Sequence, residues 1–408
     1  MIDVEKILQD VENFERSHIL NGTLLVAVGN KVVYEKGFGI ADAVTKTPCT
    51  VDTQYNIASV TKQFTAAALL RVLYDANPSI PVLKHALHKP LSKYLPPDDI
   101  LWDGEIPEWA ELVTLHHLLT HTSGIVNYTD LDSFYETIFL LENPSILDLV
   151  SLFKDKPLTF EPGSKYAYCN SSYFLLGQII SRLSHKSFSE YLRETFFVPL
   201  GMVNTSLPAR GTSLTLKKIE TYSKLARGYT YDVESWAGPY KEIENYWPLE
   251  IDQGDGGIIS TAADLIKWNN GLYKGRVLPL NVRELLLTPY IGVPDKPDTS
   301  YCYGIVSSMS PVGQIFEHGG GIPGYRTYLI YVPSLELTVV SFANLIFDFT
   351  CIQEKRNSLK QELSHIEDEE ERESKYNEIF KKRYPEVQNI LQNHSLFLVD
   401  DLTSLKEA

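Results

Sequence analysis

In residues 1–345 of this 408-residue chain, segments with the pattern of β-strands lie near the beginning and near the end, and segments with helical patterns lie between them. Residues 23–28 and 31–35 are mainly apolar and flank a Gly29-Asn30 turn, so they predict a β-hairpin. Further strands are predicted at 301–307, 314–317, 327–332 and 337–341. The sequence therefore predicts an α+β fold, in which an antiparallel sheet is flanked by helices and carries an inserted, mainly helical lobe.

Ser59 and Lys62 begin the helical stretch and form a candidate nucleophile and base. A serine hydroxyl is a poor nucleophile until a base takes its proton, and a lysine three residues later on a helix lies on the same face. Residues 65–70 are rich in Ala and Leu, which places Ser59 at a helix N-terminus. Free backbone N–H groups there can stabilise an oxyanion, so the pattern is typical of acyl transfer.

The spacing alone is weak, because Ser-x-x-Lys recurs at Ser151 and Lys154. That second pair lies in an amphipathic stretch and is interpreted as an ordinary solvated helix face. Two motifs further along the chain distinguish Ser59 from Ser151.

The first of these motifs is Tyr168-Cys169-Asn170. It can place a phenol for proton transfer and a carboxamide for a substrate amide in one cleft, or it can be a core tyrosine beside a turn asparagine. The second, which starts at His318, is His-Gly-Gly. It indicates the end of a strand where glycines let a ligand approach closely, or a plain glycine turn.

In this order the motifs resemble the serine β-lactamase and penicillin-recognising superfamily, in the branch of class C β-lactamases, D-alanyl-D-alanine carboxypeptidases, D-aminopeptidases and related esterases. The resemblance covers about residues 10–345 and includes the segments 115–124, 160–163, 199–205, 256–265 and 320–325. It implies a β-lactamase/transpeptidase-like fold and a cofactor-free serine hydrolase that forms an acyl-serine intermediate with an amide or ester.

The resemblance also implies roles for residues of this chain. Ser59 becomes the acylated nucleophile, Lys62 its base or proton relay, and Tyr168 a second proton-transfer group. Asn170 becomes a ligand of the substrate amide. The strand edge where substrate docks consists of His318, Gly319, Gly320 and Gly321, and the backbone N–H groups of Ser59 and Gly321 form the oxyanion hole. Whether Lys62 or Tyr168 takes the first proton depends on which pKa the folded site lowers.

The third motif departs from the family pattern. Penicillin-destroying members carry Lys-Thr-Gly or Lys-Ser-Gly, and neither tripeptide occurs in this chain. His318 takes that place and is expected to be partly charged near neutrality, so it would hold a substrate carboxylate less firmly than an ammonium, and better at acidic pH. We therefore expect poor β-lactamase activity and better activity on uncharged short-chain esters or on peptides.

We expect residues 1–345 to form the catalytic domain, with an α/β lobe (1–58 and 254–345), a helical lobe (59–253) and the substrate cleft between them. Residues 1–14 have apolar side chains at helical spacing and lack the features of a signal peptide. Residues 346–408 are charged and are interpreted as a solvated, helical C-terminal extension. The aromatic-rich stretch 222–247 is expected to shape the substrate pocket.

Composition argues against several kinds of partner. A net charge of −15 repels nucleic acid, and the sequence has no basic stripe with interleaved aromatics. No stretch is long and apolar enough to span a bilayer. The expected partners are a small-molecule or peptide substrate and a protein at the C-terminal extension. The expected location is the cytoplasm, or the periplasm or exterior if a leader was removed.

The cysteines and histidines do not indicate a metal site. Cys49, Cys169, Cys302 and Cys351 have no Cys-x-x-Cys pairing and are interpreted as reduced and structural, with Cys169 as a rival nucleophile. His117 and His121 have the spacing of a metal pair but lack the glutamate of a His-Glu-x-x-His motif. Two alternatives to a serine hydrolase stay open: a scaffold protein of the same fold, and a metal hydrolase using His116, His117 or His121.

Overall fold

The structure is a computed structural model. It describes residues 9, 11, 21–138, 141, 144–208, 224–231, 241–242, 254–310, 313–347, 358–366 and 368–383. The predicted N-terminal helix and the aromatic stretch 222–247 fall largely outside these residues, and Cys351 does so entirely. Within the described ranges, every helix is too short or too polar to cross a membrane.

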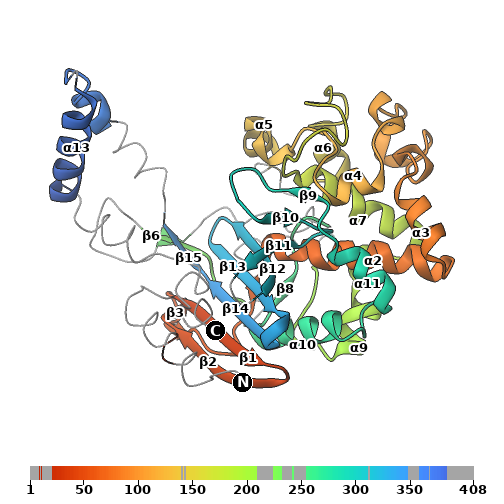
Figure 1. Cartoon of the computed structure of the whole chain (residues 1–408), viewed down its shortest axis with the longest axis horizontal. Helices are drawn as coiled ribbons and strands as arrows, with labels where there is room; N and C mark the ends of the chain where they lie inside the picture. The colour runs from red at the N-terminus through yellow and green to blue at the C-terminus, as the bar shows by residue number, and fades with distance from the viewer. Residues whose placement is uncertain are drawn as a thin grey trace.

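An eight-stranded antiparallel sheet forms the centre of the molecule (Figure 1), in the order β2-β1-β14-β13-β12-β11-β10-β9. The strands are β1 (Gly22–Val28), β2 (Lys31–Phe38), β9 (Ile291–Gly292), β10 (Thr299–Tyr301), β11 (Val306–Ser310), β12 (Gly313–Ile322), β13 (Tyr325–Val332) and β14 (Leu337–Ala343). The predicted hairpin is confirmed as β1 and β2, which turn at Gly29 with a positive φ of 59°. Strand β1 pairs with β14, so segments from both ends of residues 21–347 build one sheet.

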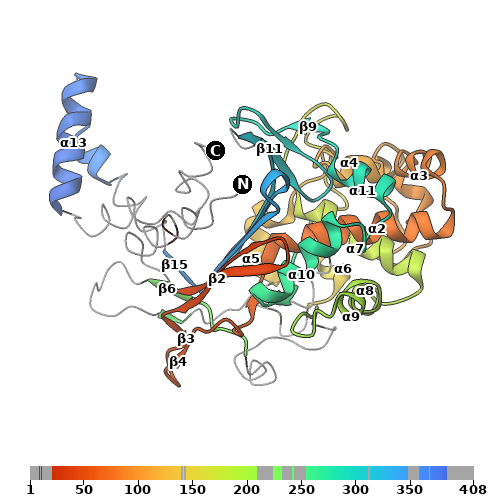
Figure 2. The ribbon, with the colours of Figure 1, turned by 60° about the horizontal axis from the view of Figure 1, so that its bottom comes forward.

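The helices follow β2 and lie mainly on one side of this sheet (Figures 1 and 2). They are α2 (Thr61–Ala76), α3 (Ile80–Leu87), α4 (Leu115–Leu119), α5 (Asp132–Thr137), α6 (Ile146–Ser151), α7 (Asn170–Ser184), α8 (Phe188–Leu192), α9 (Val198–Leu200), α10 (Ala262–Tyr273), α11 (Leu280–Leu287) and α13 (Glu369–Arg383). Three small sheets pair β3 (Ile40–Asp42) with β4 (Thr47–Pro48), β5 (Tyr55–Asn56) with β8 (Ile259–Ser260), and β6 (Tyr229–Tyr231) with β7 (Lys241–Glu242) and β15 (Leu345–Phe347). The predicted α+β class with an antiparallel sheet flanked by helices is confirmed.

One predicted strand is wrong. Residues 301–307 are not continuous, because β10 ends at Tyr301 and β11 begins at Val306. The chain turns between them at Gly304, whose φ is +70°, and a Cβ there would overlap the backbone carbonyl of Lys62. The tight turn lets this hairpin pack directly against α2.

The sheet buries apolar side chains on both of its faces. Along β1, Leu25 and Ala27 belong to the large core under the helices, whereas Leu24 and Val26 belong to a smaller cluster on the opposite face. This alternation follows from the two-residue period of a strand. The position of the central strands is therefore fixed by packing on both sides.

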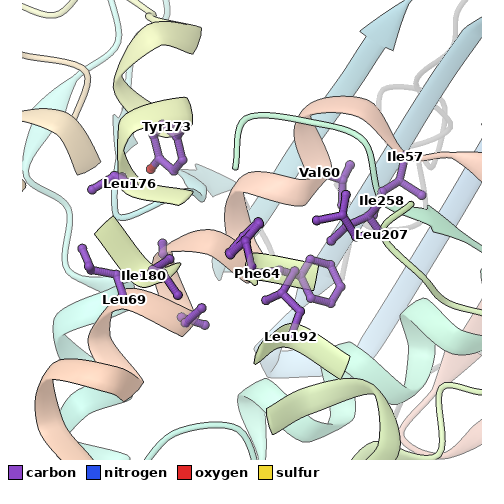
Figure 3. Packing of buried hydrophobic residues seen from close by; sticks show 14 of the residues in the cluster. Ile57, Val60, Phe64, Leu69, Tyr173, Leu176, Ile180, Leu192, Leu207 and Ile258 are labelled. Atoms are coloured by element: carbon purple, nitrogen blue, oxygen red, sulfur yellow. The ribbon is translucent and has the colours of Figure 1, made fainter. Parts of the chain in front are cut away.

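Helix α2 runs through the middle of the large core, which explains its unbroken Ala- and Leu-rich sequence. Residues 61–70 are all buried. Figure 3 shows Phe64 of α2 between a group that includes Val60 and Ile258 and a second group that includes Tyr173 of α7. The Phe64 ring stacks on that of Trp268, with 3.8 Å between centroids. A helix packed on all sides is a rigid base for the residues at its N-terminus.

Candidate active site

Ser59 lies at the start of α2, as predicted, in a short 3-10 helix formed by Ala58–Val60. The preceding Ala58 has a positive φ of 45°, an uncommon conformation for a residue with a Cβ. The Asn56 side chain stabilises this bend, because its Oδ1 accepts the backbone N–H of Ala58 at 2.8 Å. The bend presents a half-buried Ser59 at the helix N-terminus.

Lys62 is completely buried and donates from its ammonium to three oxygens. Its Nζ lies 3.1 Å from Ser59 Oγ, 2.7 Å from Asn170 Oδ1 and 2.7 Å from the main-chain oxygen of Asp255. A buried charge is costly unless its hydrogen bonds are satisfied, and these three acceptors match the three N–H bonds of the ammonium. The structure thus brings together the predicted nucleophile and the predicted base.

Tyr168 lies on the other side of Ser59, on the loop before α7. Its ring centroid is 4.9 Å from Lys62 Nζ, and its phenol lies close enough to Ser59 for the serine side chain to lower its pKa. Burial raises the pKa of the Tyr168 phenol well above its usual value, while the neighbouring Ser59 side chain opposes this shift. The phenol is therefore protonated at neutral pH and can donate a proton.

Asn170 begins α7 and lies in the site, but its amide has a different environment from the predicted substrate contact. Its Oδ1 accepts from Lys62, and its Nδ2 donates to Thr129 Oγ1 at 3.0 Å. Both ends of the carboxamide are engaged by the protein itself. In this structure Asn170 is a ligand of Lys62.

The predicted His-Gly-Gly motif lies within β12, and β12 continues beyond it to Ile322, so the prediction that a strand ends there is wrong. The neighbouring β11 pairs only with the first half of β12, from Gly313 to Glu317. Beyond that point β12 pairs with β13 on its other side. Residues 318–322 therefore offer a strand edge beside the active site, which is the arrangement that the family resemblance implies.

Packing within the protein already requires a glycine at residue 320. A Cβ at this position would overlap the Ile57 carbonyl oxygen and the Thr327 hydroxyl, which hydrogen bond to each other at 2.8 Å. The absence of a side chain lets β12 contact the bend that carries Ser59.

We expect Gly320→Ala to destabilise the protein by at least about 2 kcal/mol, since the methyl group has no space beside the backbone of Ile57. Thermal and urea unfolding would measure the loss. Gly292→Ala, on the short strand β9, is the matched control, because a Cβ there meets no atom within 4 Å. Equal stability of the two variants would contradict the packing argument.

His318 is buried and neutral, which corrects the prediction that it is partly charged near neutrality. Burial, followed by the positive charge of Lys62, lowers its pKa to about 3. Its Nδ1 lies 2.6 Å from the Gly319 carbonyl oxygen and its Nε2 lies 3.1 Å from the Tyr301 hydroxyl. Since a carbonyl only accepts, Nδ1 carries the proton and Nε2 accepts from Tyr301.

This environment removes the pH dependence expected from sequence. A histidine with a pKa of about 3 stays neutral throughout the range from pH 5 to pH 7.5. The ratio of kcat/KM for a carboxylate-bearing ester to that for a neutral ester of the same acyl group should therefore change less than about twofold over this range. A rise of about tenfold towards pH 5 would show that His318 becomes charged there.

A cavity of about 390 Å³ opens at the free edge of β12. Tyr168, His318 and the three following glycines line it, together with three more tyrosines and two cationic side chains. Apart from Tyr168, His318 and the glycines, the lining residues are Tyr166, Val293, Lys296, Tyr301, Val306, Glu317, Arg326, Thr327, Tyr328 and Ser341. Its volume suits a small molecule or the end of a peptide.

The alternative candidates do not assemble a site. Ser151 is exposed and donates to the Asp148 carbonyl, while Lys154 donates to the Trp102 carbonyl, so this pair is not joined as Ser59 and Lys62 are. The Cys169 thiol is buried, donates to the Ile125 carbonyl, and has its pKa raised by burial. It is therefore poorly suited to be a nucleophile.

The candidate metal-binding histidines His121 and His116 hydrogen bond to other groups of the protein. The Nδ1 of His121 accepts the backbone N–H of Cys169 at 3.0 Å, and His116 hydrogen bonds to the Tyr303 hydroxyl at 2.8 Å. Across the described part of the chain, no three His, Cys, Asp or Glu side chains are grouped to hold a metal ion. Cys49, Cys169 and Cys302 are free and buried.

The sequence did not indicate the residues that bind Asn170 and Asp255, the two residues that accept hydrogen bonds from Lys62. Asp255 precedes the predicted Gly-Gly segment, and its buried carboxylate accepts from the Tyr128 hydroxyl at 2.5 Å. Asn127 and Thr129 bond to Asn170. No pattern in the sequence marks these residues, because only the fold brings residues 127–129 beside residue 255.

Comparisons with known proteins agree with this geometry. A family model described as Beta-lactamase matches residues 7–347. The chain is 28% identical to penicillin-binding protein 4* of Bacillus subtilis over 340 residues, covering 82% of this chain and 70% of that protein. It is 26% identical to a D-aminopeptidase of Gluconobacter oxydans, covering 79% of this chain and 55% of that protein. It spans between 37% and 61% of the Staphylococcus aureus proteins named flp.

The chain is also similar in structure to solved penicillin-binding and amidase proteins. The octameric penicillin-binding protein homologue from Pyrococcus abyssi is 27% identical, with a TM-score of 0.67, and the match covers 84% of this chain and 74% of that one. The D-amino acid amidase from Ochrobactrum anthropi is 22% identical, with a TM-score of 0.64 and coverage of 85% and 93%. The latter likeness concerns the fold.

Proposed function

This chain belongs to the β-lactamase family of serine hydrolases, and we propose that it cleaves an amide or ester of a small molecule or peptide through an acyl intermediate on Ser59. We further propose that it is of the peptidase or esterase type and a poor β-lactamase. Relatives named as a penicillin-binding protein and a D-aminopeptidase support this assignment. They also argue against a scaffold without catalysis.

The observation that carries the proposal is the set of contacts around Ser59. Its hydroxyl lies 3.1 Å from the buried Lys62 amine and close to the Tyr168 phenol, which lines the cavity. An activated serine needs a base within hydrogen-bond reach and a proton donor for the leaving group. Both are present, and no metal ion is required for these steps.

We assign the first proton transfer to Lys62, since the Tyr168 phenol is protonated at neutral pH. Uncharged Lys62 takes the Ser59 proton as Oγ attacks the carbonyl carbon, and the negative charge moves to the carbonyl oxygen. The backbone N–H groups of Ser59 and Gly321 would stabilise this oxyanion. Tyr168 then protonates the leaving group and is reprotonated from Lys62, and water releases the acyl group by the reverse proton movements.

Partitioning of the acyl intermediate tests this function. Two esters with the same acyl group and different leaving groups would be hydrolysed in the presence of methanol as a second nucleophile. An acyl-enzyme predicts the same ratio of acid to methyl ester from both substrates, because both pass through one intermediate. Different ratios would show that water attacks each substrate directly.

The charge in the cavity supports a preference among substrates. His318 is neutral, whereas Arg326 is permanently charged and lies against Gly321, where its guanidinium occupies the space that a Cβ would need. Its Nη1 donates to the Ile322 and Tyr325 carbonyls. Among the described residues no carboxylate lies within 4.0 Å of this guanidinium. We propose that Arg326 holds anionic groups of substrates.

We expect Arg326→Gln to lower kcat/KM for a carboxylate-bearing ester by about tenfold and to leave a neutral ester with the same acyl group within about twofold. The matched substrates separate a charge effect from a general loss of structure. An equal decrease on both esters would refute the role of Arg326 in recognition.

We also propose that residues 1–345 form the catalytic domain, with the α/β and helical lobes divided as the sequence predicts, and that 346–408 form an appended segment. The family match, which stops at residue 347, supports this boundary. Helix α13 lies beyond it, apart from the sheet (Figure 1), and carries mainly charged side chains. Such a helix suits a solvated extension or contact with a protein partner.

A further inference from the structure

Three consecutive side chains bond to the two residues whose oxygens hold the active-site lysine. Asn127 Oδ1 accepts the backbone N–H of Asn170 at 2.9 Å, and Thr129 Oγ1 accepts the side-chain Nδ2 of Asn170 at 3.0 Å. Between them, the Tyr128 hydroxyl donates to Asp255 Oδ2 at 2.5 Å. The segment Asn127–Thr129 therefore contacts Asn170 twice and Asp255 once.

Lys62 and Thr129 bind opposite ends of the Asn170 amide. An amide offers an accepting oxygen at one end and a donating NH₂ group at the other. The oxygen points to Lys62 Nζ at 2.7 Å because the ammonium only donates, and Thr129 Oγ1 holds the amide in this orientation by accepting from its NH₂ group. With the amide turned over, the NH₂ group would face the ammonium, and donor would meet donor.

Tyr128 has the corresponding role at Asp255. The Asp255 carboxylate is buried, and burial raises its pKa, whereas the charge of Lys62 and the hydrogen bond from Tyr128 oppose this shift. The same residue accepts from Lys62 through its main-chain oxygen. Anchoring of the side chain by the fully buried Tyr128 thus fixes the position of that oxygen.

The two acceptors determine where the lone pair of the neutral lysine points. The ammonium has three N–H bonds, and after loss of a proton two remain. The Asn170 and Asp255 oxygens, both at 2.7 Å, hold these two bonds, whereas Ser59 Oγ lies at 3.1 Å. The third direction, which is now the lone pair, faces the Ser59 hydroxyl.

We propose that the segment Asn127–Thr129 is a positioning element for proton transfer, which aims the lone pair of Lys62 at Ser59 by holding Asn170 and Asp255. This inference rests on the proposed function, because it concerns the base of that reaction. It assigns to Thr129 and Tyr128 an effect on the chemical step without contact with substrate.

The ionisable and aromatic groups that face Lys62 also affect how the reaction rate depends on pH. They are the Tyr168 and Tyr173 rings, with centroids at 4.9 and 5.6 Å from Nζ, the Asp255 carboxylate, and the His121 and His318 imidazoles, whose pKa values are lowered by burial and then by the Lys62 charge. A change at Thr129 leaves all five groups in place and alters only the amide between them. A shifted pH profile in such a variant would therefore report the amide.

The experiment measures the second-order rate of Ser59 labelling by a fluorophosphonate between pH 5 and pH 10. This probe needs no knowledge of the natural substrate. We expect Thr129→Val to lower the plateau rate by about tenfold, the size of a lost hydrogen bond at the base, and to move the acid limb to lower pH. The limb moves down because an amide that Thr129 no longer holds stabilises the ammonium less. Tyr128→Phe should change both quantities in the same directions.

Two variants separate positioning from general damage. Thr129→Ser keeps the hydroxyl and should retain the wild-type plateau and acid limb. Tyr135→Phe removes a 3.2 Å hydrogen bond to the main-chain oxygen of Thr129 without altering the Thr129 side chain, so it should also label at the wild-type rate. Thermal unfolding of all four variants monitors the fold.

The inference is overturned if Thr129→Val keeps the wild-type plateau and acid limb, or if Thr129→Ser is as slow as Thr129→Val. Labelling of Ser59→Ala distinguishes the two proposals. If Ser59→Ala is inert while Thr129→Val equals wild type, the serine hydrolase assignment stands and the positioning element fails. If Ser59→Ala is labelled and turns over substrate as wild type does, both proposals fail together.

Discussion

Ser59→Ala is expected to abolish both turnover and fluorophosphonate labelling, with a loss of at least about 10⁴-fold. Removal of the hydroxyl removes the atom that forms the acyl bond, and within the described residues no other serine lies beside a buried lysine amine. Initial rates on an ester substrate and labelling followed by mass spectrometry would measure the effect. The fold should be unchanged, since Ser59 is half-buried and its side chain fills no core space.

The chain contains its own control for this experiment. Ser151 has the same spacing to a lysine, Lys154, but its hydroxyl bonds to the Asp148 carbonyl and the lysine points to Trp102. Ser151→Ala should therefore label and turn over as the wild type does. Equal losses in both variants would indicate that labelling reports general integrity and not a nucleophile.

Lys62→Met and Tyr168→Phe should each slow acylation by at least about a hundredfold, the usual size of a proton-transfer contribution. Methionine has the length of the lysine stem but cannot take the Ser59 proton. The Phe variant keeps the ring beside Lys62 and loses only the donor to the leaving group. Pre-steady-state measurement of the first leaving group released would isolate acylation from later steps.

The leaving group offers a further check on these roles. Tyr168→Phe should be less harmful for a p-nitrophenyl ester, whose leaving group needs no proton, than for an amide, whose nitrogen must be protonated. Lys62→Met should affect both substrates alike. An equal effect of Tyr168→Phe on the two substrates would exclude it as the donor to the leaving group.

Much of the fold could be predicted because its signals are local. The hairpin of β1 and β2 was readable from two apolar runs and a Gly-Asn turn, and α2 from its Ala- and Leu-rich stretch. The break between β10 and β11 was not readable. It depends on Gly304 packing against the Lys62 carbonyl, a contact between residues more than 200 positions apart.

The same distinction applies to the candidate site. The order of the motifs predicted that Ser59, Lys62, Tyr168 and Asn170 lie together, and the structure brings them into contact. The charge of His318 was predicted wrongly, because burial and a neighbouring ammonium cannot be read from the residue type. The contact between Tyr128 and Asp255 beside Lys62 could not be predicted for a similar reason, since these two residues meet only after folding.

The most direct test of the central claim is the mass of the protein during turnover of an ester, quenched with acid after a few milliseconds to seconds. We predict an increase equal to the acyl group that replaces one hydrogen, located by peptide mapping on Ser59, and absent from Ser59→Ala. The adduct should decay on longer incubation as water releases the acyl group. An adduct on Cys169, or continued turnover by Ser59→Ala with no adduct at all, would contradict an acyl-serine mechanism.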